Sequence, residues 1–407
     1  MIGIDRWILP DGFEDVLPDR AANVEHLRRD LLDLFDTWGY DLIIPPMLEY
    51  TDSLLVEAGR DLDLLTFRVT DQVSGKMMGI RADITPQTAR IDAHSFAREG
   101  ISRLCYAGTV LHARARGPLS SRAPTSIGVE LFGEKSVDAD IEVVNLFIQS
   151  LRLADISDVC LDIGHVDICR GLLKSAGVHS VLKSEFYDLL QRKAGTEIEN
   201  CITKNIKNPR LARWLSLLPS LVGGSDILQV ALSEFSEAPD EVLKAIEQLI
   251  SLANSVEDTG LSMHFDLSEM PGFHYHTGLV FAGFCTGSGK ILGNGGRYDC
   301  IGKAFGRNRP ATGFAFDLNL LAELSDKKIP SKGAVWYFVG DDELLNKEAK
   351  KLRKAGHRVV QLFEEASSDC VKSGDKQLLN DNGRIVVRDL ESSQINRSDY
   401  RKKDIYE

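Results

Sequence analysis

The spacing of apolar residues predicts a helix near the start of the chain and a hairpin after it. The helix follows Pro18 and is ended by Gly39. Its apolar face consists of Val24, Leu27, Leu31, Leu34 and Trp38. A short strand is predicted over Tyr40–Ile44. Leu65–Val69 and Lys76–Arg81 flank a Ser-Gly turn and predict a hairpin, and a helix is expected around Thr88–His94.

A second, longer hairpin is predicted in the middle of this region. Leu104–Leu111 and Thr125–Phe132 have the β-branched and aromatic character of strands, and a polar segment containing Gly117 separates them. The second strand ends in Gly-Val-Glu-Leu-Phe-Gly, which puts the ionisable Glu130 among apolar neighbours. This hairpin is the stretch around which the other predicted elements are arranged.

The pattern after the hairpin changes twice. Ala139–Leu153 and Val166–Ser175 are predicted helices on either side of a strand at Val159–Ile163. Leucine-rich helices without a predicted strand then fill residues 178–256, which indicates a helical insertion. Strands return at Ser262–Leu267 and Gly278–Phe284.

Glycines and a final helix close the first predicted domain, which covers residues 1–325. The Gly-rich segment Gly293–Asp299 closes this domain, with a purely structural turn at 293–296 as the alternative to a functional role, and a helix is expected over Phe316–Leu324. Residues 332–391 suggest a small C-terminal α/β unit of βαβ type. We expect the polar residues 392–407 to form a flexible tail.

Composition narrows the classes of protein to consider. The 407 residues carry a net charge of −12, which argues against a broad nucleic-acid surface and hence against tRNA as a partner. No apolar run approaches the ~20 residues that cross a bilayer, and the first residues do not resemble a secretory signal. Seven cysteines form no C-x-x-C pair. We therefore expect a cytoplasmic protein with reduced thiols and no membrane contact.

Four stretches occur in the order found in class II aminoacyl-tRNA synthetases, and specifically in the histidyl enzyme. Gly39–Glu49 resembles the dimer-forming motif 1, and Arg81-Ala-Asp-Ile-Thr85 is similar to the family's Arg-Pro-Glu-Gly-Thr. The central hairpin takes the place of motif 2. Gly295-Gly-Arg-Tyr-Asp299 and Gly313-Phe-Ala-Phe316 resemble the family's Gly-Gly-Arg-Tyr-Asp loop and motif 3. The resemblance implies an α+β fold: a class II synthetase-like antiparallel sheet flanked by helices, with a helical insertion and a small C-terminal α/β unit.

Arginines that the resemblance leads us to expect are missing. These enzymes activate an amino acid on ATP mainly by charge stabilisation, with an arginine in motif 2, another in motif 3 and divalent metal. Here His112 and Leu320 stand at those two positions, and Pro271 replaces the arginine of the histidine-specific motif. Arg114 shares strand parity with His112, so a shifted register that brings Arg114 into the pocket stays open. We expect aminoacylation to be lost, with no catalytic residue, metal or cofactor.

The polar half of the amino-acid pocket is mostly retained. Asp83 and Thr85 occupy positions where the family binds the α-amino group of histidine, and the carboxylate of Glu130 suits an ammonium or an imidazole N–H. The resemblance thus implies a histidine-binding set of Asp83, Thr85, Arg114, Ser126, Glu130, Tyr275, His276, Arg297 and Tyr298.

Phe273-His-Tyr-His-Thr-Gly278 and the stretch Ala304–Phe314 narrow the resemblance to regulatory subunits of ATP phosphoribosyltransferase, which are paralogues of histidyl-tRNA synthetase. This resemblance implies a non-catalytic protein that binds a short-form catalytic subunit in a hetero-octamer and senses histidine as an allosteric feedback inhibitor. Self-dimerisation through the motif 1-like region is also implied. The alternatives are a divergent catalytic histidyl-tRNA synthetase and a stand-alone phosphoribosyltransferase, whose usual phosphate loop we do not find in the sequence.

Overall fold

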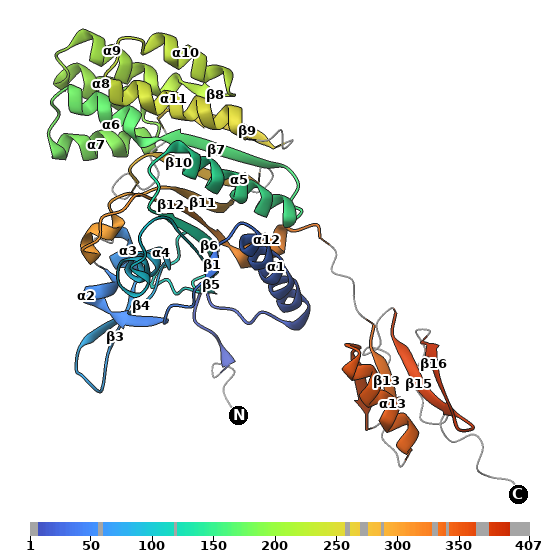
Figure 1. The fold of residues 1–407 in the computed structure, drawn as a ribbon. Helices are drawn as coiled ribbons and strands as arrows, with labels where there is room; N and C mark the ends of the chain where they lie inside the picture. The colour runs from blue at the N-terminus through green and yellow to red at the C-terminus, as the bar shows by residue number, and fades with distance from the viewer. Residues whose placement is uncertain are drawn as a thin grey trace, which may run out of the picture. The chain divides into compact units, whose positions relative to one another are not determined.

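The chain divides into two compact units, Met1–Lys327 and Lys328–Glu407 (Figure 1). The computed structural model describes residues 7–55, 60–117, 120–256, 261–268, 276–285, 289–327, 333–338, 342–363 and 374–390. Three expectations fall outside these residues: the flexible tail at 392–407, and the positions of Pro271 and Tyr275.

The first unit is built on a nine-stranded sheet in the order β1-β5-β6-β12-β11-β10-β7-β9-β8. Its strands are β1 (Asp41–Leu42), β5 (Ser102–Thr109), β6 (Thr125–Phe132), β7 (Val159–His165), β8 (Val222–Gly223), β9 (Ser262–Asp266), β10 (Leu279–Cys285), β11 (Ile291–Arg297) and β12 (Ala311–Asp317). The pairs β1–β5 and β7–β9 are parallel and the others antiparallel, so the expected antiparallel sheet is mixed toward its edges.

One face of this sheet is covered by α1 (Pro18–Thr37), α5 (Val137–Leu153) and α12 (Leu318–Leu324) (Figure 1). Phe147 of α5 lies at the centre of this core, with ring centroids 5.1 Å from Phe281, 5.2 Å from Phe314 and 4.5 Å from Phe316. The apolar face predicted for the first helix is the one that packs here, with Leu27 and Leu31 both buried. This helical layer holds the strands in place, and the opposite face of these strands carries the candidate site.

The opposite face receives a three-stranded sheet and its helices. The order is β2-β4-β3, with β2 (Leu48–Tyr50), β3 (Phe67–Thr70) and β4 (Met77–Ile80) all antiparallel. The flanking helices are α2 (Thr51–Leu54), α3 (Arg60–Leu65), α4 (Thr85–Arg90) and the π-helical turn Ile91–Phe96. Ala89 of α4 packs against Leu104, Phe132 and Tyr298 of the main sheet. The α4 helix thereby lies over the strands that carry Glu130.

Residues 180–255 form the helices expected from the leucine-rich pattern, and the separately predicted helix at residues 166–175 precedes them. They are α6 (Val166–Ser175), α7 (Ser180–Gln191), α8 (Gly195–Asn205), α9 (Pro209–Leu217), the 3-10 turn Leu218–Ser220, α10 (Asp226–Glu234) and α11 (Asp240–Ser255). The expectation that no strand interrupts them is wrong, because β8 pairs with β9 and adds an edge to the main sheet. Two residues are too few to produce an alternating pattern.

Two sequence predictions near the end of the first unit are corrected. The glycines from Gly293 to Gly296 form strand β11 rather than a turn, because their missing side chains leave space for Phe316 and Phe281 against the backbone. The helix expected from Phe316 begins at Leu318, since β12 runs on to Asp317. The Asp317 carboxylate accepts hydrogen bonds from the amides of Asn319 and Leu320 and so caps α12. A 3-10 turn, Ile301–Phe305, lies between β11 and β12 in the chain.

The second unit is a four-stranded sheet with one described helix. The sheet order is β14-β13-β15-β16, with β13 (Val335–Phe338), β14 (Val359–Leu362), β15 (Lys376–Asp381) and β16 (Arg384–Asp389). Helix α13 (Glu343–Lys354) connects the parallel pair β13 and β14, which is the βαβ arrangement expected. Strand β15, which pairs with β13 and β16, was not predicted from the sequence.

Candidate functional site

Glycines line one face of the main sheet where the retained pocket residues gather. Glu130 of β6 pairs with Gly313 of β12, and Gly313 pairs in turn with Gly296 of β11. Because alternate residues share a face, Ser126 and Gly128 lie on the same side as Glu130. We call this side, opposite α5, the glycine face. Its glycines leave room above the strands for side chains from other elements.

Glu130 is buried there with incomplete hydrogen bonding. It is 1% exposed; Oε1 accepts a hydrogen bond of 3.3 Å from the hydroxyl of Tyr106, and Oε2 has no partner among the described residues. Burial raises the pKa of Glu130 well above its usual value, and the nearby carboxylate of Asp83 raises it further. The side chains of Thr85 and Tyr106 partly offset that rise in pKa. A positive charge placed next to Glu130 would therefore be stabilised by the site.

Asp83 and Thr85 reach Glu130 from the start of α4. The Asp83 Oδ1 atom accepts hydrogen bonds from the Thr85 amide at 3.1 Å and from its hydroxyl at 3.2 Å. The Thr85 side chain also acts on Glu130, although its single hydroxyl proton can be donated to only one carboxylate at a time. The structure thus brings together Asp83, Thr85 and Glu130, which the resemblance predicts to bind the α-amino group or an imidazole N–H of histidine.

Tyr298 and His276 complete the same side of the site. A β-carbon added at Gly313 would lie 2.1 Å from Glu130 Oε2 and 2.6 Å from the Tyr298 hydroxyl oxygen, so both atoms lie over this glycine. The rings of His276 and Tyr298 are 6.5 Å apart, and a β-carbon at Gly296 would lie 2.9 Å from His276 Cδ2. Both side chains are buried.

His112 is buried beside Asp83 and is held in a neutral form. Its Nε2 lies 3.1 Å from the carbonyl oxygen of Ala82, and its Nδ1 has no partner among the described residues. Burial is the largest cause that lowers the pKa of His112 to about 4, and Arg116 lowers it as well. At neutral pH this imidazole adds no positive charge to the pocket.

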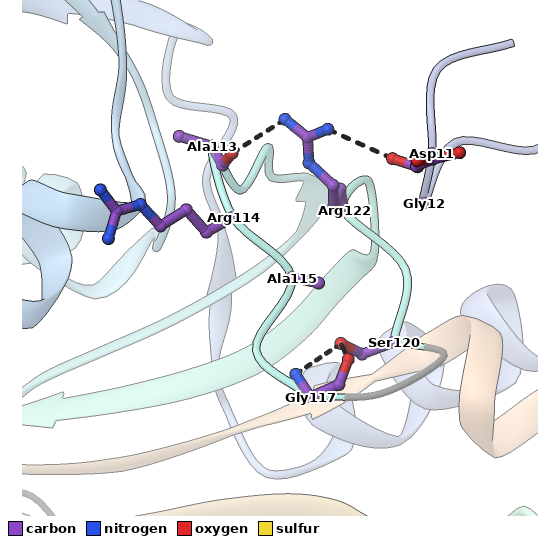
Figure 2. A pocket seen from close by; sticks show the side chains of 8 residues that line it. All are labelled: Asp11, Gly12, Ala113, Arg114, Ala115, Gly117, Ser120 and Arg122. Atoms are coloured by element: carbon purple, nitrogen blue, oxygen red, sulfur yellow. Dashed lines mark hydrogen bonds between the residues drawn. The ribbon is translucent and has the colours of Figure 1, made fainter.

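Arg114 lies apart from these residues, in the exposed part of the hairpin loop. It lines a cavity of about 470 Å³ together with Arg122 and the Asp11-Gly12 segment, and its side chain extends away from the other lining residues (Figure 2). Arg122 holds this loop by donating to the carbonyl oxygens of His112 at 3.0 Å, Ala113 at 2.9 Å and Asp11 at 3.2 Å.

Arg297 is the exception among the expected ligand-binding residues. Arg297 pairs with Thr312, and Thr312 pairs with Leu131, whose side chain lies in the core on the α5 side. The Arg297 side chain is therefore on the opposite face of the sheet from Glu130. Its guanidinium donates to the Asp140 carboxylate at 2.9 Å and to the carbonyl oxygens of Glu134 and Ser136. The expected contact of Arg297 with the ligand is therefore corrected to a supporting role beneath the Gly-rich strand.

Two residues on the glycine face were missed as site residues. Tyr106 contacts Glu130 directly, and its strand parity with the next glycine, Gly108, was the available signal. Arg81 lies over Gly108, a contact between segments far apart in the chain that no local pattern predicts. Leu320, at the motif 3 position, packs against the main hydrophobic core. Among the described residues, no cluster of three His, Cys, Asp or Glu side chains is arranged to hold a metal.

Comparison with known proteins defines the class. A family model described as histidyl-tRNA synthetase matches residues 12–321. A histidyl-tRNA synthetase from Nostoc sp. PCC 7120 superposes with a TM-score of 0.77 at 18% identity, over 96% of each chain. The fold is that of a histidyl-tRNA synthetase-like class II protein, as expected from the motif order.

Nearer relatives define the family. Proteins named ATP phosphoribosyltransferase regulatory subunit are 48% identical, from Saccharophagus degradans over 88% of this chain and 91% of theirs, and from Cellvibrio japonicus over 95% and 98%. A solved ATP phosphoribosyltransferase regulatory subunit/histidyl-tRNA synthetase from Bacillus halodurans C has a TM-score of 0.78 at 28% identity, over 89% of this chain and 94% of that one. The chain belongs to the family of ATP phosphoribosyltransferase regulatory subunits.

The buried carboxyl predicts a pH-dependent stability. Because the pKa of Glu130 is higher in the folded state than its ordinary value of 4.5, folding takes up a proton above about pH 4.5. The stability contributed by the neutral acid is present below that pH and is lost as pH rises through the folded-state pKa. Glu130→Gln should therefore gain stability relative to the unmodified chain as pH rises, by up to about 1.4 kcal/mol per pH unit.

Denaturant unfolding of the ligand-free protein between about pH 5 and pH 8 measures this difference. Glu99→Gln, at an exposed position, is the matched control and should follow the unmodified chain at every pH. A constant stability difference between Glu130→Gln and the unmodified chain would show that Glu130 is ionised throughout.

Proposed function

We propose that this chain binds and activates a short-form ATP phosphoribosyltransferase catalytic subunit and transmits feedback inhibition by histidine to it. The names of its close relatives indicate a regulatory subunit. The observation that carries the histidine part is the buried Glu130 beside the half-buried Asp83 on the glycine face. Neither carboxylate forms an ion pair with a basic side chain among the described residues.

A buried carboxyl group with a half-buried carboxylate beside it favours a ligand that brings positive charge and N–H donors. In the proposed complex the α-ammonium group of histidine donates to Asp83 and Thr85, and an imidazole N–H donates to Glu130. The unsatisfied Oε2 of Glu130 and the hydroxyl of Tyr298 both lie over Gly313, where an aromatic ring of the ligand can approach the strand. His276 and Tyr298 supply ring surfaces around it.

The same pocket lacks features needed to activate an amino acid on ATP. Stabilising the transferred phosphate requires fixed positive charge. His112 is neutral at pH 7, Leu320 lies against the core, and the Arg297 guanidinium is paired with Asp140 on the other face. These observations support a non-catalytic role over the alternative of a divergent histidyl-tRNA synthetase.

We also propose self-dimerisation through the motif 1-like region, within an assembly of four regulatory and four catalytic subunits. Apolar side chains around β1 and β2 are exposed, and such patches typically mark protein contacts. They are Leu42, Ile44, Met47, Leu48 and Tyr50. The proposed location is the cytoplasm, since the six described cysteines are all free thiols. No described helix has the length and apolarity needed to span a bilayer.

Histidine can inhibit the attached enzyme only if it binds more tightly to the less active state. The proposed coupling elements are the hairpin loop at residues 112–124 and the Arg297-Tyr298 pair at the end of β11. His112 of the loop is buried beside Asp83, and the Tyr298 hydroxyl lies over Gly313. Arg122 links that loop to the Asp11–Phe13 segment by hydrogen bonds and by stacking 4.9 Å from the Phe13 ring. An ordered pocket would therefore change the surface formed by the loop and this segment.

Reconstitution tests the regulatory function. Adding the purified chain to a short-form catalytic subunit from the same source should raise phosphoribosyl-ATP formation, and histidine should then lower it. In Glu130→Ala the activation should persist while the inhibition by histidine weakens, because Glu130 is only 1% exposed and its truncation leaves the surface of the chain unchanged. Failure of the chain to co-purify with the catalytic subunit or to change its rate would contradict the proposal.

Calorimetric titration of histidine into the isolated chain tests the pocket itself. Glu130→Ala should weaken binding by about 1.5–3 kcal/mol, because a charge-assisted hydrogen bond is lost. Glu99→Ala, at an exposed position, should bind as the unmodified chain does. The absence of heat with millimolar histidine on the unmodified chain would exclude the pocket, and an unchanged affinity in Glu130→Ala would remove Glu130 from it.

A further inference from the structure

Arg81 is a buried cation without a carboxylate partner. Its side chain is 6% exposed, and among the described residues no carboxylate lies within ion-pair distance of it. The carboxylate of Glu49 acts on its charge, but it already accepts hydrogen bonds from Arg90 and Gln87. A buried charge without a counterion is costly, so this position favours an anion from elsewhere.

One edge of the guanidinium remains available. Arg81 Nε donates to the carbonyl oxygen of Thr109 at 3.0 Å, and Nη1 donates to that of Pro45 at 2.9 Å. Nη2 makes no hydrogen bond to a described residue. These two backbone contacts fix the plane of the guanidinium and leave Nη2 with donors to offer.

The free edge lies over the glycine face. A β-carbon added at Gly108 would lie 2.4 Å from Arg81 Nη2, and Gly108 is directly opposite Ser126 in the sheet. Cross-strand neighbours present their side chains on the same face, so Arg81, Ser126 and Glu130 all border one site. The site has the Arg81 cation near Ser126 and the carboxyl group of Glu130 near Gly313.

We propose that Arg81 binds the α-carboxylate of the amino-acid ligand, with Ser126 beside it. This inference rests on the proposed histidine pocket and assigns to Arg81 the positive charge that the neutral His112 does not supply. An amino-acid zwitterion matches the arrangement, because its ammonium group meets Asp83 while its carboxylate meets Arg81. Ligands that keep the amine and the imidazole but lack the carboxylate would miss this contact.

The test compares histidine with histamine, which is histidine without its carboxylate, by calorimetry at about pH 7.5, where both imidazoles are neutral. The unmodified chain should bind histidine about 10- to 100-fold more tightly than histamine, as for loss of one charge-assisted contact. Arg81→Met should bind the two ligands with similar affinity and should retain the histamine affinity of the unmodified chain. Arg103→Met, which removes an arginine paired with Glu142 on the other face, is the control and should keep the preference.

A second variant tests the proposal even if Arg81→Met fails to fold. Gly108→Ala leaves Arg81 intact but puts a β-carbon where Nη2 lies, so it should lower the affinity for histidine and spare that for histamine. Equal weakening of both ligands in both variants would mean that Arg81 only supports the fold. An unchanged preference for histidine would assign the carboxylate to another residue. Failure of histidine to bind the unmodified chain would instead overturn the proposed function.

Discussion

The burial of Glu130 beside Asp83 is the constraint on which the rest of the site depends. Two carboxylates on one face of a sheet repel each other, and burial raises the pKa of Glu130 well above its usual value. The fold tolerates this because glycines at Gly128, Gly296 and Gly313 clear the face above the strands and the α5 side provides a large apolar core. In the proposed function, a cationic ligand recovers this stability when it binds.

The same sheet separates two roles by strand parity. Arg297 and Asp140 form a buried ion pair on the α5 side, where they hold the Gly-rich strand to the start of that helix. Glu130, Tyr298 and the α4 residues lie on the other side, the glycine face. A synthetase fold can lose its phosphate-facing cations without losing this arrangement, because the carboxylates that face an amino acid are carried by different strand positions. This is how a catalytic scaffold can serve a regulatory subunit.

Much of the fold was predictable from the sequence, and the site only in part. The strand Thr125–Phe132 was predicted from its residue types, and the resemblance grouped Ser126 and Glu130 with Asp83 and Thr85. In the structure Ser126 and Glu130 share one face of β6, and the Thr85 side chain acts on Glu130. Arg297 was assigned to the pocket by its resemblance to the Gly-Gly-Arg-Tyr-Asp loop, whereas its register in β11 puts it on the α5 side. The neutrality of His112 and the position of Arg81 over Gly108 depend on burial and on long-range packing, which no local pattern contains.

The central claim is that the chain retains a site for histidine but not the charges needed to activate it on ATP. Histidine-dependent exchange of pyrophosphate into ATP, measured on a sample whose histidine binding has been established by calorimetry, tests this most directly. The account predicts saturable histidine binding and no exchange above the rate without protein. Exchange that requires both histidine and the purified chain would contradict it.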